Sequence, residues 1–134
     1  AKMIERNKRW EQKKTDNESD QGLLQRAQYL NKKYFHGTLD FSIRFVTNQN
    51  SRYGSCTSLD RTIRISEKIK TMPTWVQDYI IIHELAHLLH PDHSKKFWEK
   101  VNQYRYTERA RGYLIAVGVE KLEEETEQTD FENR

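Results

Sequence analysis

The sequence predicts an α+β domain in which a small antiparallel or mixed sheet packs on one buried helix, with further helices at its flanks. Three observations support this fold class. From Tyr79 to Leu89 every residue is apolar except His83, Glu84 and His87, which is the pattern of a helix buried on nearly all sides. Residues 41–45 alternate apolar and polar side chains, as a strand with one buried face does. The length of 134 residues suits one domain with one core.

The two ends of the chain are expected to lie outside this domain, which we place at residues 20–118. Only 35% of the residues are hydrophobic and 32% are charged, so part of the chain should contribute nothing to the core. Residues 1–19 form a charged arm and linker. Residues 119–134 form an acidic tail with a net charge of −5, and this composition is typical of a disordered segment.

The first half of the domain is expected to hold one helix and three strands. Its helix has apolar residues at helical spacing: Leu23, Ala27, Leu30 and Tyr34. Asp20 is the expected N-cap of this helix, which should run for about fifteen residues and end near Gly37. After the strand at 41–45 and a polar turn at 48–51, residues 52–57 and 62–66 should form a hairpin across residues 58–60.

The second half of the domain should be helical. Thr74 and Gln77 form a capping-box pattern, so the buried helix is expected to begin at Thr74 and to run about sixteen residues until Pro91 ends it. Ser94 can cap a second helix, whose apolar stripe should pack against the region of His93: Phe97, Trp98, Val101 and Tyr104. Residues 107–117 form a last helix that Gly118 stops.

The three polar residues of the buried helix have the spacing of a metal site. His87 lies about 40° around the helix from His83 and about 6 Å along its axis, so both imidazoles point toward one place. Glu84 lies at the edge of the same arc, where a carboxylate can act as a general base on a metal-bound water. Ordinary hydrogen bonds to each histidine are the alternative, but two histidines and a glutamate in register inside an apolar helix favour a metal, and zinc is the metal we expect.

A zinc ion held by two imidazoles needs a third protein ligand, and two histidines compete for that position. Pro91 should end the helix near His90 and turn the chain back, which returns His93 toward the site. His90 would lie about 10 Å along the axis from His83, too far for both to bind one ion. We therefore predict His93 as the third ligand and His90 as a residue at the rim.

The motifs that carry a family resemblance are Arg52-Tyr53-Gly54-Ser55-Cys56, His83-Glu84-Leu85-Ala86-His87, and Asp92-His93-Ser94 with Phe97-Trp98. Together they resemble the YgjP-like metallopeptidases, which are related to the SprT and WLM families, over residues 23–118. The family usually has Trp where this chain has Tyr53. The resemblance implies a compact zincin-like metallopeptidase domain with His83, His87 and His93 on one zinc ion and Glu84 as the catalytic base. It also implies that one hairpin strand binds extended substrate by main-chain pairing.

The hairpin residues Arg52, Tyr53 and Cys56 each have more than one possible role. Arg52 and Tyr53 could donate hydrogen bonds to the oxyanion that forms during peptide hydrolysis, or they could be a surface pair on a strand. Cys56 could bind the metal as a thiolate, but three histidines already suffice for a catalytic zinc, so a small buried hydrophobic role fits it better.

Charge and composition bound the partners. The chain outside the acidic tail carries +8, since the whole chain carries +3, and such a basic surface can bind nucleic acid or can simply be solvated. No apolar run is long enough for a membrane span, and one cysteine fits a reducing cytoplasm. We thus expect a cytoplasmic zinc metallopeptidase acting on peptides or proteins. The alternatives are a binding module with structural zinc and a DNA-associated, SprT-like protein.

Overall fold

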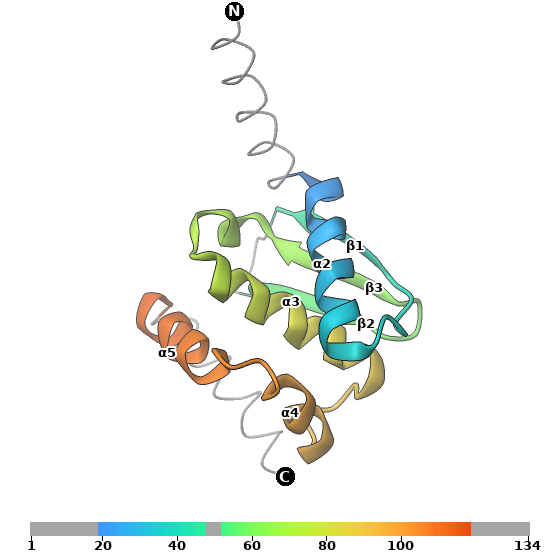
Figure 1. The fold of residues 1–134 in the computed structure, drawn as a ribbon. Helices are drawn as coiled ribbons and strands as arrows, with labels where there is room; N and C mark the ends of the chain where they lie inside the picture. The colour runs from blue at the N-terminus through green and yellow to red at the C-terminus, as the bar shows by residue number, and fades with distance from the viewer. Residues whose placement is uncertain (1–18, 48–51, 119–134) are drawn as a thin grey trace, which may run out of the picture.

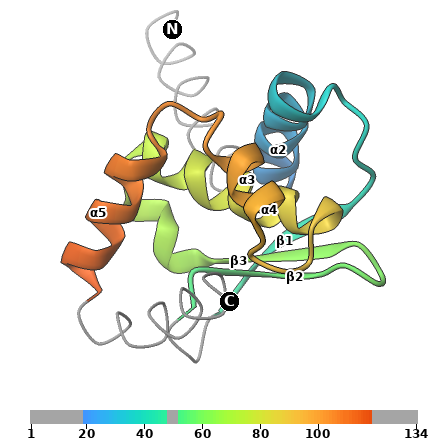
Figure 2. The same cartoon turned by 90° about the horizontal axis from the view of Figure 1, so that it is seen from below.

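The sheet has three strands and mixed topology. In the computed structural model, which describes residues 19–47 and 52–118, the strands are β1 (Ser42–Val46), β2 (Gly54–Thr57) and β3 (Thr62–Ser66). β3 lies in the centre, parallel to β1 and antiparallel to β2. Figures 1 and 2 show the helices α2 (Asp20–Phe35) and α3 (Thr74–Leu89) on the same face of the sheet. The α+β prediction is confirmed, and the sheet is the mixed one of the two predicted kinds.

Several sequence predictions fall on residues outside this description. They are residues 1–18 of the charged arm predicted at 1–19, the acidic tail at 119–134 and the polar turn at 48–51. The predicted hairpin is confirmed, because Thr57 pairs with Thr62 and the register continues to Gly54 opposite Ile65. β2 has β3 as its partner and forms one edge of the sheet.

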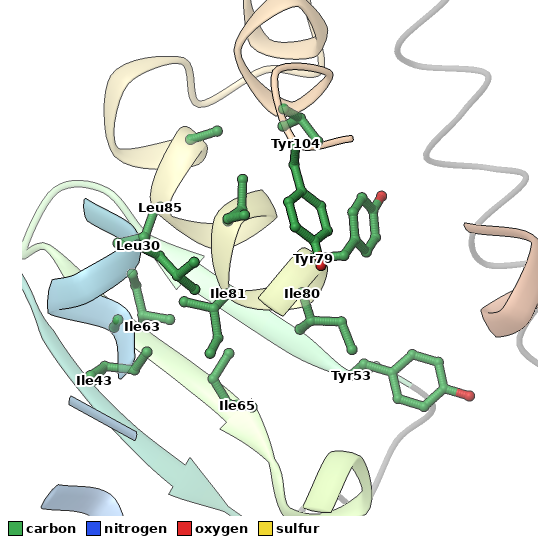
Figure 3. Packing of buried hydrophobic residues seen from close by; sticks show 14 of the residues in the cluster. Leu30, Ile43, Tyr53, Ile63, Ile65, Tyr79, Ile80, Ile81, Leu85 and Tyr104 are labelled. Atoms are coloured by element: carbon green, nitrogen blue, oxygen red, sulfur yellow. The ribbon is translucent and has the colours of Figure 1, made fainter. Parts of the chain in front are cut away.

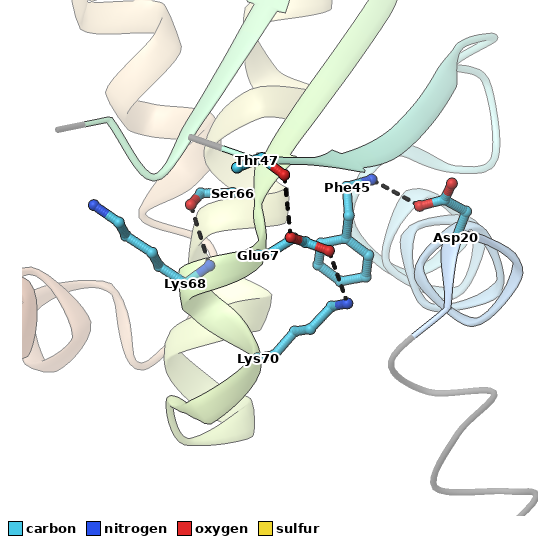
Figure 4. A network of polar contacts seen from close by, with 7 residues as sticks. All are labelled: Asp20, Phe45, Thr47, Ser66, Glu67, Lys68 and Lys70. Atoms are coloured by element: carbon cyan, nitrogen blue, oxygen red, sulfur yellow. Dashed lines mark hydrogen bonds and ion pairs between the residues drawn. The ribbon is translucent and has the colours of Figure 1, made fainter. Parts of the chain in front are cut away.

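The N-cap of helix α2 lies one residue earlier in the chain than predicted. Ser19 is the N-cap, and its hydroxyl accepts a hydrogen bond from the amide of Gly22 at 3.0 Å, so the assignment of Asp20 as the cap was wrong. Asp20 instead accepts a hydrogen bond from the amide of Phe45 at 2.8 Å and ties the helix to β1 (Figure 4). The helix ends at Phe35, two residues before Gly37, as predicted from its spacing.

A short 3₁₀ helix, Glu67–Thr71, connects β3 to the buried helix α3. Figure 4 shows the polar contacts at its start, where the Ser66 hydroxyl accepts a hydrogen bond from the Lys68 amide at 3.1 Å. The predicted capping box does not form, because Pro73 is the N-cap of α3 and Gln77 donates its side-chain amide to the carbonyl of Met72. The predicted bounds of α3 are nevertheless confirmed, since Pro91 prevents helical geometry at the preceding residue.

The core lies between α3, α2 and the inner face of the sheet. Figure 3 shows Ile81 and Leu85 of α3 beside Leu30 of α2 and the central-strand residues Ile63 and Ile65. All five are at most 2% exposed. Because burial of one large aliphatic side chain contributes about 1.5–3 kcal/mol, this cluster holds α3 firmly against the sheet.

The remaining helices are α4 (Lys95–Val101) and α5 (Thr107–Val117). α5 has its predicted bounds, whereas α4 ends before Tyr104, which was expected on its apolar stripe. The hydroxyl of Ser94 caps α4 through the amide of Phe97, as expected. Tyr104, placed on the stripe of this helix by its spacing, lies in the turn after α4, where its hydroxyl donates to the carbonyl of Trp75 at 2.8 Å. No helix within residues 19–47 and 52–118 is long and apolar enough to cross a membrane.

Candidate metal centre

Helix α3 and the chain that follows it bring three imidazole rings together. His83 and His87 are four residues apart on α3, and His93 returns to them after the break at Pro91. The centroid of the His87 ring is 5.0 Å from that of His83 and 4.5 Å from that of His93. The structure therefore joins the three histidines that the sequence selected. His90 is not part of this group.

The nitrogens of these rings have the separations of ligands that share one ion. Nε2 of His93 lies 3.0 Å from Nε2 of His87 and 3.4 Å from Nε2 of His83. Two nitrogens about 2.1 Å from one ion at a tetrahedral angle are about 3.4 Å apart. The His83–His93 distance matches this value and the His87–His93 distance is shorter, so the nitrogens are close enough together to share one cation.

Hydrogen bonding between the rings is a poorer explanation of the same distances. Nε2 of a neutral imidazole carries one proton or one lone pair, so it makes one good hydrogen bond. Nε2 of His93 faces two other nitrogens, those of His83 and His87, and it cannot satisfy both. A cation satisfies all three lone pairs at once, so the donor set fits a metal ion.

Phe97 of α4 holds the three rings in place. Its ring stacks on His87 with centroids 4.4 Å apart and meets His83 and His93 edge-on at 5.0 and 4.9 Å. Phe97 is completely buried, which restricts its own motion. The expectation that the α4 stripe packs beside His93 agrees with these contacts.

Groups around the site favour neutral histidines whose Nε2 lone pair is available to a metal. Nδ1 of His87 lies 3.2 Å from the carbonyl oxygen of His90, so Nδ1 carries the proton and Nε2 keeps its lone pair. Nδ1 of His83 lies 3.4 Å from the Tyr79 hydroxyl. Burial, with help from neighbouring imidazoles, lowers the pKa of His83 well below its ordinary value and that of His93 to about 4. Burial likewise lowers the pKa of His87.

Glu84 is buried beside the histidines and lies against strand β2. Its exposed fraction is 6%, and burial raises the pKa of its carboxyl to about 8 despite the opposing charges of Arg52 and Arg64. A methyl group on Gly54 would lie 3.1 Å from Oε2 of Glu84 and 3.2 Å from its Cγ. The absence of a side chain at Gly54 therefore lets the carboxylate sit close to the strand.

A family model described as YgjP-like, metallopeptidase domain, matches residues 8–111 of this chain. The chain belongs to this metallopeptidase family. The fold is also similar to the crystal structure of the metallopeptidase zymogen of Pyrococcus abyssi abylysin, with a TM-score of 0.60 and 22% sequence identity. That match covers 72% of this chain and 91% of abylysin. No curated protein matches the sequence.

The histidines of this YgjP-like chain open onto a cleft of about 220 Å³. Its walls contain the four predicted site residues and six others: Arg52, Gly54, Ser55, Cys56, Ser58 and Pro91. Most of these six come from β2 and the start of its hairpin turn, so the edge strand forms one wall. Gly54, Ser55 and Ser58 were not predicted to line the site, although a glycine within a strand signals close approach of another group.

Arg52, Tyr53 and Cys56 of the hairpin lie in three different environments. Arg52 is exposed and lines the cleft, whereas Tyr53 is only 9% exposed and belongs to the hydrophobic core (Figure 3). Tyr53 therefore contributes to packing. Cys56 is half-buried on the cleft wall, and burial raises the pKa of its thiol to about 12. Its sulfur is outside the three-histidine group, and the neutral thiol is a poor metal ligand.

Proposed function

We propose that this chain is a zinc-dependent peptidase in which His83, His87 and His93 hold one zinc ion and Glu84 is the general base. Membership of a metallopeptidase family makes peptides or proteins the substrates. The observation that carries the assignment is the convergence of three Nε2 atoms, at 3.0 and 3.4 Å, on a cleft that Glu84 also lines.

The ligand set supports a catalytic rather than a closed structural zinc site. Structural zinc has four protein ligands, whereas catalytic zinc typically has three and keeps one position open. Among the described residues, the group that could hold a metal contains three histidines and no fourth ligand. Zinc bound there would supply a Lewis acid that polarises the substrate carbonyl and makes water a nucleophile near neutral pH. Related divalent metals such as Ni²⁺, Co²⁺ or Mn²⁺ would also fit imidazole ligands.

Glu84 would move the protons of the reaction. Its carboxylate accepts a proton from the attacking water and then gives it to the leaving amine. A base for this role works best with a pKa near the working pH, and burial brings the pKa of Glu84 to about 8 before any cation acts on it. A bound dication would lower that value and keep the carboxylate ionised.

Strand β2 is the proposed binding site for the substrate main chain. It is an edge strand, and its residues Gly54, Ser55 and Cys56 line the cleft beside Glu84. An extended peptide could pair with this edge as an added strand, which would place a peptide carbonyl beside the histidines. The position of β2 supports the sequence expectation that one hairpin strand has this role.

Metal analysis with peptidase assays tests the assignment. Glu84→Gln should retain zinc and lower turnover by about 10²–10⁴-fold, the usual contribution of a general base. His83→Ala and His87→Ala should lose the metal. His90→Ala is the matched control, because it keeps the backbone carbonyl that accepts from His87, and it should retain both zinc and activity. Full activity of Glu84→Gln on every cleaved peptide would refute the role of Glu84.

The alternative functions stay predictions with their own tests. A structural zinc in a binding module would require a fourth protein ligand, which spectroscopy of the Co²⁺-substituted protein would reveal. A DNA-associated, SprT-like function would give binding to single-stranded DNA that weakens steeply with salt. The cytoplasmic location and the boundaries at residues 20 and 118 likewise stay predictions.

A further inference from the structure

A row of aromatic side chains joins three helices at a distance from the cleft. Its rings come from α2, from the turn between α4 and α5, from the first turn of α3 and from α5 (Figure 1). Neighbouring ring centroids are 5.8–6.4 Å apart in the order Tyr34, Tyr104, Tyr106, Trp75 and Tyr113, and we call this set the aromatic row. None of these five residues lines the cleft. The row is therefore separate from the candidate metal centre.

Four of the five rings are accessible to solvent. Tyr104 is the exception, because it is only 6% exposed and its hydroxyl donates to the carbonyl of Trp75. The other four rings are partly exposed. The row thus has a buried edge that packs against the domain and an outer edge that a planar ligand can contact.

Two arginines lie over the Tyr106 ring, near the middle of the row. The guanidinium carbon of Arg105 is 5.1 Å from the ring centroid, and that of Arg109 is 5.6 Å from it. Both arginine side chains are exposed. Their stacking on the ring keeps two positive charges beside the aromatic surface.

Lys33 has a similar place at the α2 end of the row. Its Nζ atom lies 5.5 Å from the centroid of the Tyr34 ring and 5.8 Å from that of the Tyr29 ring. Tyr29 is 50% exposed. Since Lys33 lies over both rings, it connects the row to a further accessible tyrosine.

The acidic side chains of these elements do not match the basic ones. α2 and residues 102–117 contain six basic residues, namely Arg26, Lys32, Lys33, Arg105, Arg109 and Arg111, and two acidic ones, Asp20 and Glu108. Arg26 pairs with Asp78, and Arg111 pairs with Glu108. Within the described part of the chain, Lys33, Arg105 and Arg109 form no ion pair. The row therefore carries positive charge that an anionic partner can match.

We propose that the aromatic row binds single-stranded nucleic acid, with its rings against the bases and with Lys33, Arg105 and Arg109 on the phosphates. Proteins that bind single strands without sequence preference combine these two kinds of contact. An acidic protein segment would pair with the cations but would leave the rings without a role, so a nucleic acid matches more of the surface. The inference does not rest on the proposed peptidase function, because the row lies outside the cleft.

Fluorescence anisotropy of a labelled thymidine oligonucleotide of about 16 nucleotides tests binding to the full chain. The logarithm of the association constant should fall with the logarithm of the salt concentration with a slope of about −2, because each of three cations contributes about −0.7. The same oligonucleotide without its bases should bind at least about fivefold more weakly, since the rings lose their partners. Equal binding of the two, tighter binding of polyglutamate, or no binding at about 50 mM salt would overturn the proposal.

Variants of the rings and of the cations test the two kinds of contact separately. Tyr29→Leu, at an exposed position, should weaken binding of the thymidine oligonucleotide at least about fivefold and leave binding of the strand without bases unchanged. Arg105→Gln and Arg109→Gln should each bring the salt slope about 0.7 closer to zero.

Arg44→Gln is the matched control for the arginine variants, because it removes the same charge from another face of the domain. Arg44 is exposed and follows the buried Ile43 in β1, so its side chain lies on the face of the sheet opposite the core. This variant should leave the salt slope unchanged. An effect as large as that of Arg109→Gln would mean that binding depends on net charge alone, and the assignment to the aromatic row would fail.

Discussion

Helix α3 carries two buried carboxylates, Asp78 and Glu84, and each is 6% exposed. Asp78 receives two hydrogen bonds from the guanidinium of Arg26, at 2.8 and 2.5 Å, which join α3 to α2. Glu84 has no cation within ion-pair distance among residues 19–47 and 52–118, and burial raises its pKa to about 8. Two acids with equal burial on one helix therefore have opposite electrostatic environments.

The difference separates a structural acid from a candidate catalytic one. A buried charge with a bidentate partner stabilises the fold, and the pKa of Arg26 is raised by its hydrogen bond to Asp78. A buried carboxyl without an ion pair disfavours its own charged form, which is a common property of acids and bases in active sites. Burial alone does not distinguish these roles, but the partner of each carboxylate does.

The largest effect is expected at Asp78. Asp78→Asn should lower the free energy of unfolding by about 2–3 kcal/mol, because it leaves Arg26 without its charged partner. This expected loss in stability is smaller than for a fully buried ion pair, because the Arg26 side chain is 43% exposed and water can solvate its charge in the variant. Chemical denaturation measures the change. Glu67→Gln, at the exposed Lys70 pair, is the control and should change stability by less than about 0.5 kcal/mol. An equal effect of the two substitutions would contradict a structural role for Asp78.

The thiol of Cys56 reports on the environment of Glu84. Burial, followed by the charge of Glu84, raises the pKa of Cys56 to about 12. Iodoacetamide should therefore modify the native metal-free protein at pH 8.5 about 30-fold more slowly than the denatured chain, after allowing for the higher nucleophilicity of a more basic thiolate. Because the unfolded thiol loses its proton first, this group's contribution to stability is lost as pH rises above about 9. Equal rates in the native and denatured protein would show that the cleft wall is open to solvent.

Gly54 tests how tightly Glu84 is held. Gly54→Ala places a methyl group 3.1 Å from Oε2 of Glu84, so the carboxylate must move by a few tenths of an ångström. We expect a loss of about 1 kcal/mol in stability together with a fall in kcat. Gly112→Ala is the matched control, because nothing lies within 4 Å of the added atom on α5, and it should raise stability by about 0.5–1 kcal/mol. Unchanged kcat in Gly54→Ala would mean that the position of Glu84 is not critical.

Local signals explain why much of this fold could be predicted. The ends of α3 and α5 follow from Pro91 and Gly118, and the hairpin follows from alternation around a polar turn. The meeting of His83, His87 and His93 follows from helical spacing and one chain break. These features depend on residues that are close in sequence.

Features that depend on distant residues were not predicted. The parallel pairing of β1 with β3, the close approach of Gly54 to Glu84 and the stacking of Arg111 on Trp98 all require the packed structure. The N-cap of α2 was predicted wrongly for the same reason, since Asp20 accepts a hydrogen bond from the amide of Phe45, 25 positions away. Sequence spacing shows which residues lie on one face, but tertiary packing decides their partners.

Glu84→Gln gives the smallest expected change in stability and the sharpest contrast with Asp78. At pH 7 the buried carboxyl of the metal-free protein is largely protonated, because its pKa is about 8, and glutamine replaces it with a neutral group of similar shape. The free energy of unfolding of the metal-free protein should therefore differ from wild type by less than about 0.5 kcal/mol. The same carboxylate-to-amide change at Asp78 removes the negative charge that pairs with Arg26. A loss at Glu84 as large as that at Asp78 would show that Glu84 holds the fold together, and the distinction between the two acids would fail.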